Sequence, residues 1–154
     1  MSPLRIAIGA DHGGFALKEK LVKFLKSKGH QVKDFGTTSA KSCDYPLIGY
    51  KVAKEISLKK AERGVLICKT GIGLAMVANK LPKVRAAVCH DIKSAISSRE
   101  HNDANLLVFG ALFIKENLAK KILGIWLKAK ALGERHGRRV KQIEAIENKL
   151  RKSK

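Results

Sequence analysis

Residues 4–29 have the sequence LRIAIGADHGGFALKEKLVKFLKSKG, which contains the pattern that is most informative about the fold class. Its first five residues, Leu4 to Ile8, form a short β-rich run that predicts a strand. After a glycine-rich loop, apolar residues recur at helical spacing on one face, at Leu17, Leu21, Phe24 and Leu25. The pair Lys28-Gly29 is a typical helix end. The stretch therefore predicts a strand followed directly by an amphipathic helix.

The same pattern is repeated along the chain. Four further short runs predict strands, at Gln31–Phe35, Val65–Cys68, Arg85–Cys89 and Asn105–Phe109. Three helices are predicted from their start signals: from Pro46 to about Lys60, after Gly73, and from the N-cap Asp91 to about Glu100. Two more are predicted from apolar residues at helical spacing: Leu118, Ile122 and Trp126 in one, and Val140, Ile143, Ile146 and Leu150 in the other. Alternating strands and helices predict a three-layer α/β/α protein with a Rossmann-like parallel sheet of about five strands.

Length and composition indicate one globular domain over residues 1–154, with a C-terminal helix and a short basic tail that frays after Leu150. Hydrophobic residues make up 45% of the chain and charged residues 29%, which excludes a disordered protein. No apolar stretch approaches the roughly 18 residues of a membrane span, and the N-terminus lacks the pattern of a secretion signal. We expect a cytoplasmic protein that does not enter membranes.

The three cysteines, Cys43, Cys68 and Cys89, form no Cys-x-x-Cys pair, so free thiols are expected rather than disulfides or a zinc site. The charge is unusual, because 32 basic and 13 acidic residues give +19. A basic surface attracts sugar phosphates, nucleotides or nucleic acid. Most of the lysines have the spacing of a solvated helix face, so charge alone does not choose a partner.

In a parallel α/β sheet, ligands bind at the carboxyl ends of the strands. The first strand is followed by Asp11 and His12, beside glycines that let backbone approach a ligand. This pair could handle hydroxyl protons and bind phosphate. Alternatively, Asp11 caps the next helix and His12 points to solvent.

The third strand ends at Cys68 and is followed by Lys69, Thr70, Gly71, Ile72 and Gly73, after which a helix begins. Backbone N–H groups of such a glycine loop suit a phosphate or an enolate oxygen. A cysteine there lies in a positive potential and could act as a nucleophile or a general base. The alternative is a buried structural cysteine with a plain glycine turn after it.

Two further clusters carry candidate chemistry. His101 ends a predicted helix, where it could act as a general acid or simply be a structural histidine. Arg135 and Arg139 lie four apart on one helical face and could grip a phosphate, or belong to a basic surface helix.

Several motif classes are absent from the sequence. It has no G-x-G-x-x-G after the first strand and no phosphate-binding G-x-x-x-x-G-K-[ST], which speaks against dinucleotide cofactors and nucleotide triphosphatases. The remaining histidines have no metal-ligand spacing, and we expect them to be ordinary surface residues: His30, His90 and His136.

Taken in order, these clusters resemble one known family. GADHGG (residues 9–14), DYP (44–46), CKTGIG (68–73), SREHNDAN (98–105) and RHGRRV (135–140) are similar to the motifs of ribose-5-phosphate isomerase B, from Arg5 to about Ile146. The family includes subunits of allose-6-phosphate and galactose-6-phosphate isomerases. The resemblance implies interconversion of an aldose phosphate and its ketose phosphate, without metal or cofactor. It also implies a homodimer with shared active sites, and leaves open whether dimers pair into tetramers.

The resemblance also assigns catalytic roles. Cys68 corresponds to the base that moves a proton between C1 and C2, and His101 to the acid that opens the furanose ring. Asp11 and Thr70 correspond to groups that handle hydroxyl protons. In another branch of the family a glutamate six residues after the cysteine position is the base; here that position is Leu74, which indicates the cysteine type.

For substrate binding, the amides of Lys69, Gly71, Ile72 and Gly73 correspond to donors that hold the enediolate. The phosphate would be held by His12, Arg135 and Arg139, a sugar oxygen by Asn102, and Tyr45 would flank the pocket.

The sequence departs from the family pattern at two positions. Lys69 replaces a usual glycine, and its backbone would be strained if φ were positive there. Leu112 replaces a common phosphate-binding arginine, which weakens the expected phosphate clamp. These departures keep two alternatives open: an isomerase of another aldose phosphate, such as allose 6-phosphate or galactose 6-phosphate, and a non-catalytic paralogue that binds sugar phosphates or nucleic acid.

Overall fold

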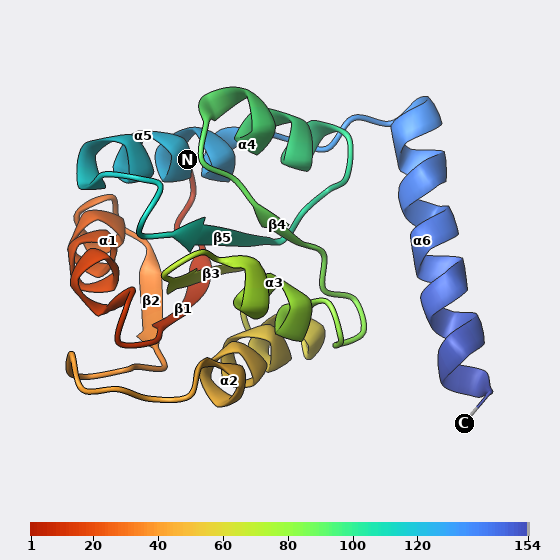
Figure 1. Cartoon of the computed structure of the whole chain (residues 1–154). Coiled ribbons are helices and arrows are strands. Elements are labelled where there is room, and N and C mark those ends of the chain that lie inside the picture. Colours follow the sequence, from red (N-terminus) through yellow and green to blue (C-terminus); the bar gives the residue numbers. More distant parts are fainter. Residues whose placement is uncertain (154) are drawn as a thin grey trace.

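The computed structural model describes residues 1–153, and in them a five-stranded parallel sheet forms the centre of the molecule (Figure 1). The strands lie in the order β2-β1-β3-β5-β4. Their bounds are Arg5–Ala10 for β1, Gln31–Asp34 for β2, Arg63–Cys68 for β3, Ala86–Val88 for β4 and Leu106–Gly110 for β5. Every neighbouring pair is parallel. The predicted fold class is therefore confirmed, with strand ends shifted by one to two residues.

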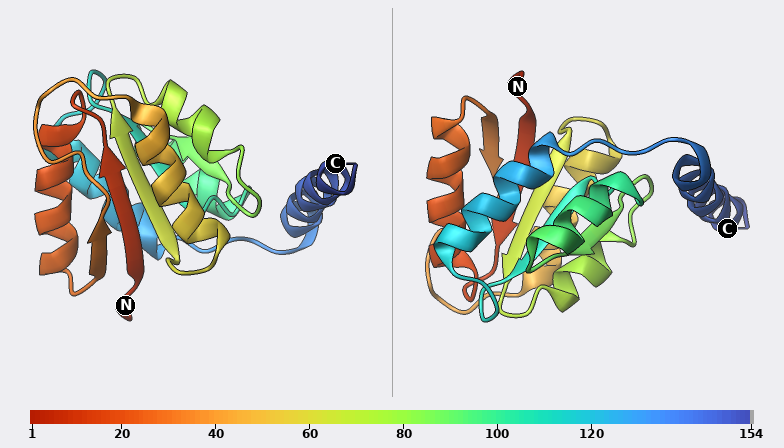
Figure 2. Two further views of the ribbon diagram at one scale, coloured as in Figure 1. Left: turned by 90° about the horizontal axis from the view of Figure 1, so that it is seen from below. Right: turned by 90° about the horizontal axis from the view of Figure 1, so that it is seen from above.

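Helices cover both faces of the sheet, as Figure 2 shows. One face carries α1 (Phe15–Ser27), α4 (Ile92–Glu100) and α5 (Glu116–Lys128), and the other carries α2 (Tyr45–Ser57) and α3 (Ile72–Ala78). The apolar core is accordingly split in two. Ile6 and Ile8 belong to the core under α1 and α5, whereas Ala7 between them belongs to the core under α2. Alternate residues of one strand face opposite sides, so a sheet buried on both faces needs apolar residues at every position.

The predicted helix boundaries agree closely with the structure. The carboxylate of Asp91 accepts the N–H of Ser94 at 2.7 Å and caps α4, as predicted. The second helix ends at Ser57 rather than near Lys60, because Lys59 has a φ of 58°, which no α-helix can include.

The last helix, α6 (Glu134–Lys152), stands apart from the sheet and buries none of its residues (Figures 1 and 2). It continues past Leu150 to Lys152. In the span from Met1 to Ser153, no helix combines the length and the apolar character needed to cross a bilayer.

Candidate active site

Asp11 and Cys68 lie side by side at the carboxyl edge of the sheet, because β1 and β3 are neighbours in it. Ala10, the last residue of β1, pairs with Ile67, and the N–H of Asp11 donates to the carbonyl of Ile67 at 3.2 Å. Cys68 ends β3 and pairs with Gly110 at the end of β5. The strand order therefore brings together two residues that are 57 positions apart in the sequence (68 − 11 = 57).

The loop after Cys68 folds back over the sulfur atom. Sγ of Cys68 accepts the N–H of Gly71 at 3.1 Å, and the side chain is 5% exposed. Gly71 has a φ of +79°, and a Cβ on it would lie 3.2 Å from the carbonyl carbon of Phe109, so only glycine fits this tight return. The cysteine is buried, as one interpretation of the sequence held, yet a backbone donor points at its sulfur.

Asp11 is also a buried residue, and its carboxylate caps the turn before α1. Oδ1 accepts the N–H groups of Gly13 at 2.9 Å and Gly14 at 3.1 Å. The hydrogen bonds that the described chain makes to this carboxylate all go to Oδ1. Asp11 therefore closes the turn before α1 and is not the cap of the helix itself, whose N-cap is Gly14 without a side-chain cap hydrogen bond.

His12 and Tyr45 come to the same edge from different elements. Nδ1 of His12 accepts the N–H of Cys43 at 3.2 Å, so in the neutral ring the proton lies on Nε2, which can donate to an anion. Tyr45 begins α2 and packs on Gly73, where a Cβ would lie 2.5 Å from the tyrosine ring. Tyr45 therefore forms a wall beside the loop that follows Cys68.

Lys69 and Leu112, the two departures from the family pattern, are neighbours at this edge. The N–H of Leu112 donates to the carbonyl of Lys69 at 3.0 Å, and the Leu112 side chain is 67% exposed. Lys69 is not among the non-glycine residues with positive φ, so its backbone carries no such strain. Its stem covers Gly13, where a Cβ would lie 2.7 Å from Cγ of Lys69.

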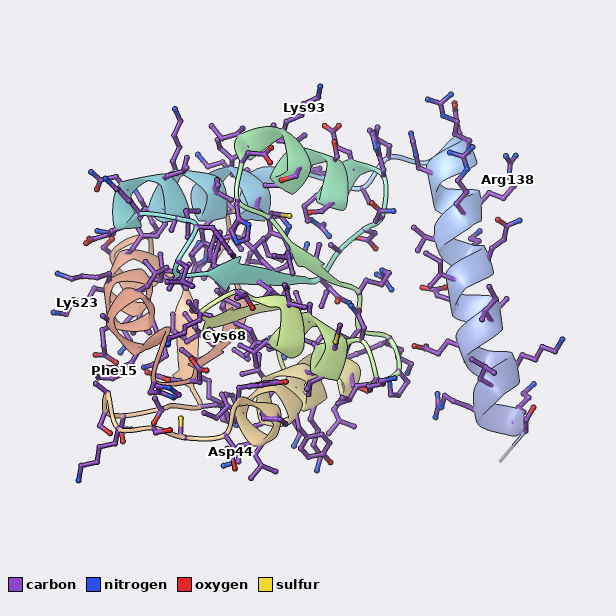
Figure 3. All side chains as sticks on the ribbon, viewed as in Figure 1. Phe15, Lys23, Asp44, Cys68, Lys93 and Arg138 are labelled. Atoms are coloured by element: carbon purple, nitrogen blue, oxygen red, sulfur yellow. The ribbon has the colours of Figure 1, made fainter. Side chains whose placement is uncertain are left out.

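Thr70 lies in the loop after Cys68, where its Oγ1 accepts the N–H of Ile72 at 3.3 Å, whereas the candidate residues of the later motifs lie at the opposite edge. His101 is the C-cap of α4 and Asn102 follows it, just before the amino end of β5. Four residue steps of about 3.3 Å separate Leu106 from Gly110, so the two edges lie about 13 Å apart along β5. Arg135 and Arg139 occupy the first turns of α6. Figure 3 labels Cys68 at the end of β3 and Arg138 far from it on α6. One chain alone does not bring Cys68 and His101 together.

His101 and the residues at the start of α6 nevertheless lie close to one another. The rings of His101 and His136 are stacked, with centroids 4.2 Å apart. Partial burial lowers the pKa of His136, and the charges of His101, Arg135 and Arg139 lower it further. His136 is therefore held toward its neutral form within a basic cluster.

Asp103 supports the turn that follows α4, a structural role that the sequence did not show. Its two carboxylate oxygens accept from Arg99 at 2.7 Å and from Arg85 at 2.9 Å, and they hold the turn that presents His101. Asp103 itself has a φ of 45°. The acidic residue in the HNDAN segment was visible, but only the fold supplies its two arginine partners.

Two of the histidines expected at the surface lie inside the molecule. His30 is 7% exposed, and its Nδ1 accepts the N–H of Leu4 at 3.1 Å. His90 is half-buried, and its Nε2 accepts the N–H of Gly110 at 2.9 Å. Both accept a backbone N–H that would otherwise lack a partner, a role that sequence spacing does not reveal. Among residues 1–153, no cluster of three or more His, Cys, Asp or Glu could hold a metal ion.

The parallel α/β sheet with a glycine loop folded over a strand-end cysteine places the chain among α/β proteins that carry their ligand site at the carboxyl edge of the sheet, and sequence comparison specifies the family. The profile of the Ribose/Galactose Isomerase family matches residues 6–143, so the chain belongs to that family.

Individual relatives agree with this assignment. The chain is 43% identical to ribose-5-phosphate isomerase B of Escherichia coli, over 94% of its own length and 97% of that protein. It is 40% identical to D-erythrulose-4-phosphate isomerase of Pectobacterium atrosepticum, over 94% and 96%. The structure of ribose-5-phosphate isomerase B from Clostridium thermocellum matches with a TM-score of 0.93 and 47% identity, over 96% of this chain and 99% of that one.

Proposed function

We propose that this chain interconverts ribose 5-phosphate and ribulose 5-phosphate, with Cys68 as the base. The observation that carries the proposal is the geometry at Cys68: a cysteine at a strand end, with the N–H of Gly71 on its sulfur and Asp11 directly after the neighbouring strand β1. The relatives named ribose-5-phosphate isomerase B, at 43% identity over nearly the whole chain, support the choice of substrate.

The chemistry follows from the acidity of the substrate. The C2 proton of an open-chain aldose is weakly acidic, so its removal needs a close base and donors that stabilise the negative charge as it forms. Cys68 takes the proton from C2, the electron pair moves to the C1 carbonyl oxygen, and the amides of Lys69–Gly73 hold the resulting enediolate. The same sulfur returns the proton to C1. Asp11 and Thr70 move the hydroxyl proton that completes the ketose.

The ring must open before this step, and the phosphate must be held during it. His101 is the acid that protonates the ring oxygen, and Asn102 binds a sugar oxygen. The phosphate lies between His12, Arg135 and Arg139, while Tyr45 closes one side of the pocket. Phosphate contacts far from C1 and C2 convert binding energy into orientation of the reacting carbons over the sulfur.

Because these residues lie at two edges of one chain, we assign the working enzyme as a homodimer in which each site is shared. A second copy would bring His101, Asn102 and the arginines of α6 to the cysteine edge. Apolar side chains are exposed around that edge, with Ile72 at 55% and Phe113 at 58%, and also along α6. Burying such patches is the usual driving force of association. One domain over residues 1–154 and a cytoplasmic location complete the proposal.

A second candidate function keeps the chemistry and changes the sugar. Leu112 stands at the cysteine edge in place of the family's phosphate-binding arginine, so the phosphate could lie at a different distance from C1. Allose 6-phosphate, galactose 6-phosphate and the four-carbon erythrose 4-phosphate are the substrates that this candidate names. The relative called D-erythrulose-4-phosphate isomerase favours including the last.

One experiment separates these possibilities. Purified wild type, Cys68→Ala and the control Cys89→Ala are each assayed with ribose 5-phosphate and with the other three aldose phosphates. Cys89 is also a buried free thiol, so the control removes the same group elsewhere. We expect turnover of ribose 5-phosphate by wild type and Cys89→Ala, and loss of at least about a thousandfold in Cys68→Ala. Full activity of Cys68→Ala refutes the base assignment, and faster turnover of another aldose phosphate selects the second candidate.

A further inference from the structure

A second cavity lies far from the cysteine edge, where the end of α1 meets the end of α5. Its volume is about 440 Å³, within the range of small-molecule sites. Phe24 and His30 line it from α1 and the start of β2, and Gly124 and Leu127 line it from α5. Since α1 ends and β2 begins at the amino edge of the sheet, this cavity is on the side opposite Cys68. Figure 2 shows the two helices side by side on one face.

The floor of the cavity is apolar and open because residue 124 is a glycine. A Cβ on Gly124 would lie 3.7 Å from the ring of Phe24, an ordinary contact distance. The space above Gly124 is therefore open because this residue has no side chain, and a small side chain would fit there without a clash. Phe24 and Ile125 provide the apolar surface on which a flat ring could lie, and the buried Leu127 packs beneath it. The ammonium of Lys28 lies 5.6 Å from the centroid of the Phe24 ring, at the border between floor and rim.

Every charged side chain at the rim of the cavity is basic, and Met1 also lines it. Lys28, Lys120, Lys121 and Lys128 line it, and its lining includes no carboxylate. Lys120 is paired with Glu116, whereas no ion pair within residues 1–153 engages the other three. These three unpaired ammonium groups carry more positive charge than a ligand with a single carboxylate could neutralise. Their charge matches that of a di- or triphosphate.

His30 adds a neutral donor to the lining. Its Nδ1 accepts the N–H of Leu4, so Nε2 carries the ring proton and is the nitrogen left for a ligand. Burial lowers the pKa of His30 and favours this neutral state.

We propose that this cavity binds a nucleoside polyphosphate, with the base on the floor of Phe24 and Ile125 and the phosphates on Lys28, Lys121 and Lys128. An acyl chain is less suited to it, because the cavity is an open groove rather than a closed apolar tunnel. The site goes beyond the proposed isomerase function, since none of its lining residues belongs to the proposed isomerase site.

The test measures ATP binding to the full chain by calorimetry and by the fluorescence of Trp126, the only tryptophan of the sequence, which lies between lining residues Ile125 and Leu127. Gly124→Leu fills the floor while Gly124→Ala leaves it open, and both replacements favour the helix. Lys121→Glu/Lys128→Glu reverses the rim. Lys20→Glu/Lys23→Glu changes the net charge equally on exposed residues outside the lining; Lys23 projects outward in Figure 3.

We expect ATP to bind wild type, Gly124→Ala and the Lys20/Lys23 variant with similar affinity. Gly124→Leu and the Lys121/Lys128 variant should bind roughly tenfold or more weakly, as expected for lost stacking and charge-assisted hydrogen bonds. Isomerase activity, unchanged in Gly124→Leu, verifies that this variant is folded.

Three outcomes overturn the proposal. The first is no binding of millimolar ATP by wild type. The second is equal weakening by both lysine variants, which would mean attraction to the overall positive charge. The third is binding of inorganic tripolyphosphate as tight as that of ATP, or binding of oleate in place of ATP, either of which removes the nucleotide from the assignment.

Discussion

The imidazole rings of His101 and His136 are stacked in parallel, with an interplanar angle of 7° and centroids 4.2 Å apart. This contact joins the end of α4 to the first turn of α6 and so keeps His101 beside Arg135 and Arg139. The proposed ring-opening acid and two of the proposed phosphate ligands therefore move as one group. Within one chain this group lies far from Cys68. The first two predictions concern the role of His101 and the sharing of sites between chains.

Replacement of His101 should affect ring opening and spare the proton transfer at carbon. In His101→Asn we expect turnover of ribose 5-phosphate, which is mostly a closed furanose, to fall by about 10²–10⁴. Erythrose 4-phosphate has no free hydroxyl that could close a five-membered ring, so any turnover of it should fall far less. Steady-state rates on both substrates give the comparison, with His90→Asn as a matched control. Equal losses on the two substrates would contradict the assigned role.

A mixture of two inactive variants should regain activity if sites are shared. Cys68→Ala and His101→Asn are unfolded and refolded together, so that half of the dimers carry one chain of each kind. Each mixed dimer has one intact site of two, so the mixture should reach about one quarter of wild-type activity. The separately refolded variants are the control. A mixture as inactive as its components would show that each site uses a single chain.

The buried Lys18 should stabilise the loop that positions Asp11. Its side chain is 1% exposed and contacts the carboxylate of Asp34, which accepts the N–H of Gly36 at 2.8 Å. The carbonyl of Gly36 in turn accepts the N–H of Ala10 at 2.7 Å, directly before Asp11.

In Lys18→Met we therefore expect the free energy of unfolding to fall by about 1–3 kcal/mol, below the full cost of breaking a buried pair because Asp34 is partly exposed. Urea denaturation measures the loss. Lys20→Met, an exposed lysine on the same helix, should change stability little. A Lys18→Met variant with wild-type stability and full activity would show that Lys18 does not stabilise the loop that positions Asp11.

His30 should make stability depend on pH below neutrality. Burial lowers its pKa from the ordinary 6.5, so the folded chain binds this proton less readily than the unfolded chain. The stabilisation from neutral His30 is complete above pH 6.5 and is lost as the pH falls below that value toward the folded pKa. Denaturation between about pH 7 and about pH 5 should show a shallower decline for His30→Gln than for wild type. Parallel declines would show that His30 does not couple protonation to folding.

Restoring the arginine at position 112 should strengthen phosphate binding. The Leu112 side chain is exposed beside the carbonyl of Lys69 and has room for a longer group. We expect Leu112→Arg to lower the KM for ribose 5-phosphate about tenfold with little change in kcat, the pattern of uniform binding. Leu118→Arg adds the same charge on an exposed part of α5 and should leave KM unchanged. An unchanged KM in Leu112→Arg would show that the phosphate does not bind within reach of position 112.

Much of the site could be predicted because its key residues directly follow strands. Asp11 after β1 and Cys68 at the end of β3 were expected at one edge, and the observed strand order makes them neighbours. The structural partners of the site could not be predicted in this way. The contacts of Lys18 with Asp34, of Asp103 with Arg85 and of His12 with the amide of Cys43 join segments that no local pattern relates.

Local sequence patterns were sufficient to predict the secondary structure elements. Apolar runs specify five strands, helical periodicity specifies the helices between them, and caps such as Asp91 set their ends, because all of these depend on near neighbours in the chain. Which loops lie next to each other depends instead on how the whole chain packs. This packing buried His30, gave Lys69 an unstrained backbone, and placed His101 and Cys68 at opposite edges of one sheet. These outcomes follow from strand order and from the packing of distant segments, which a one-dimensional pattern does not encode.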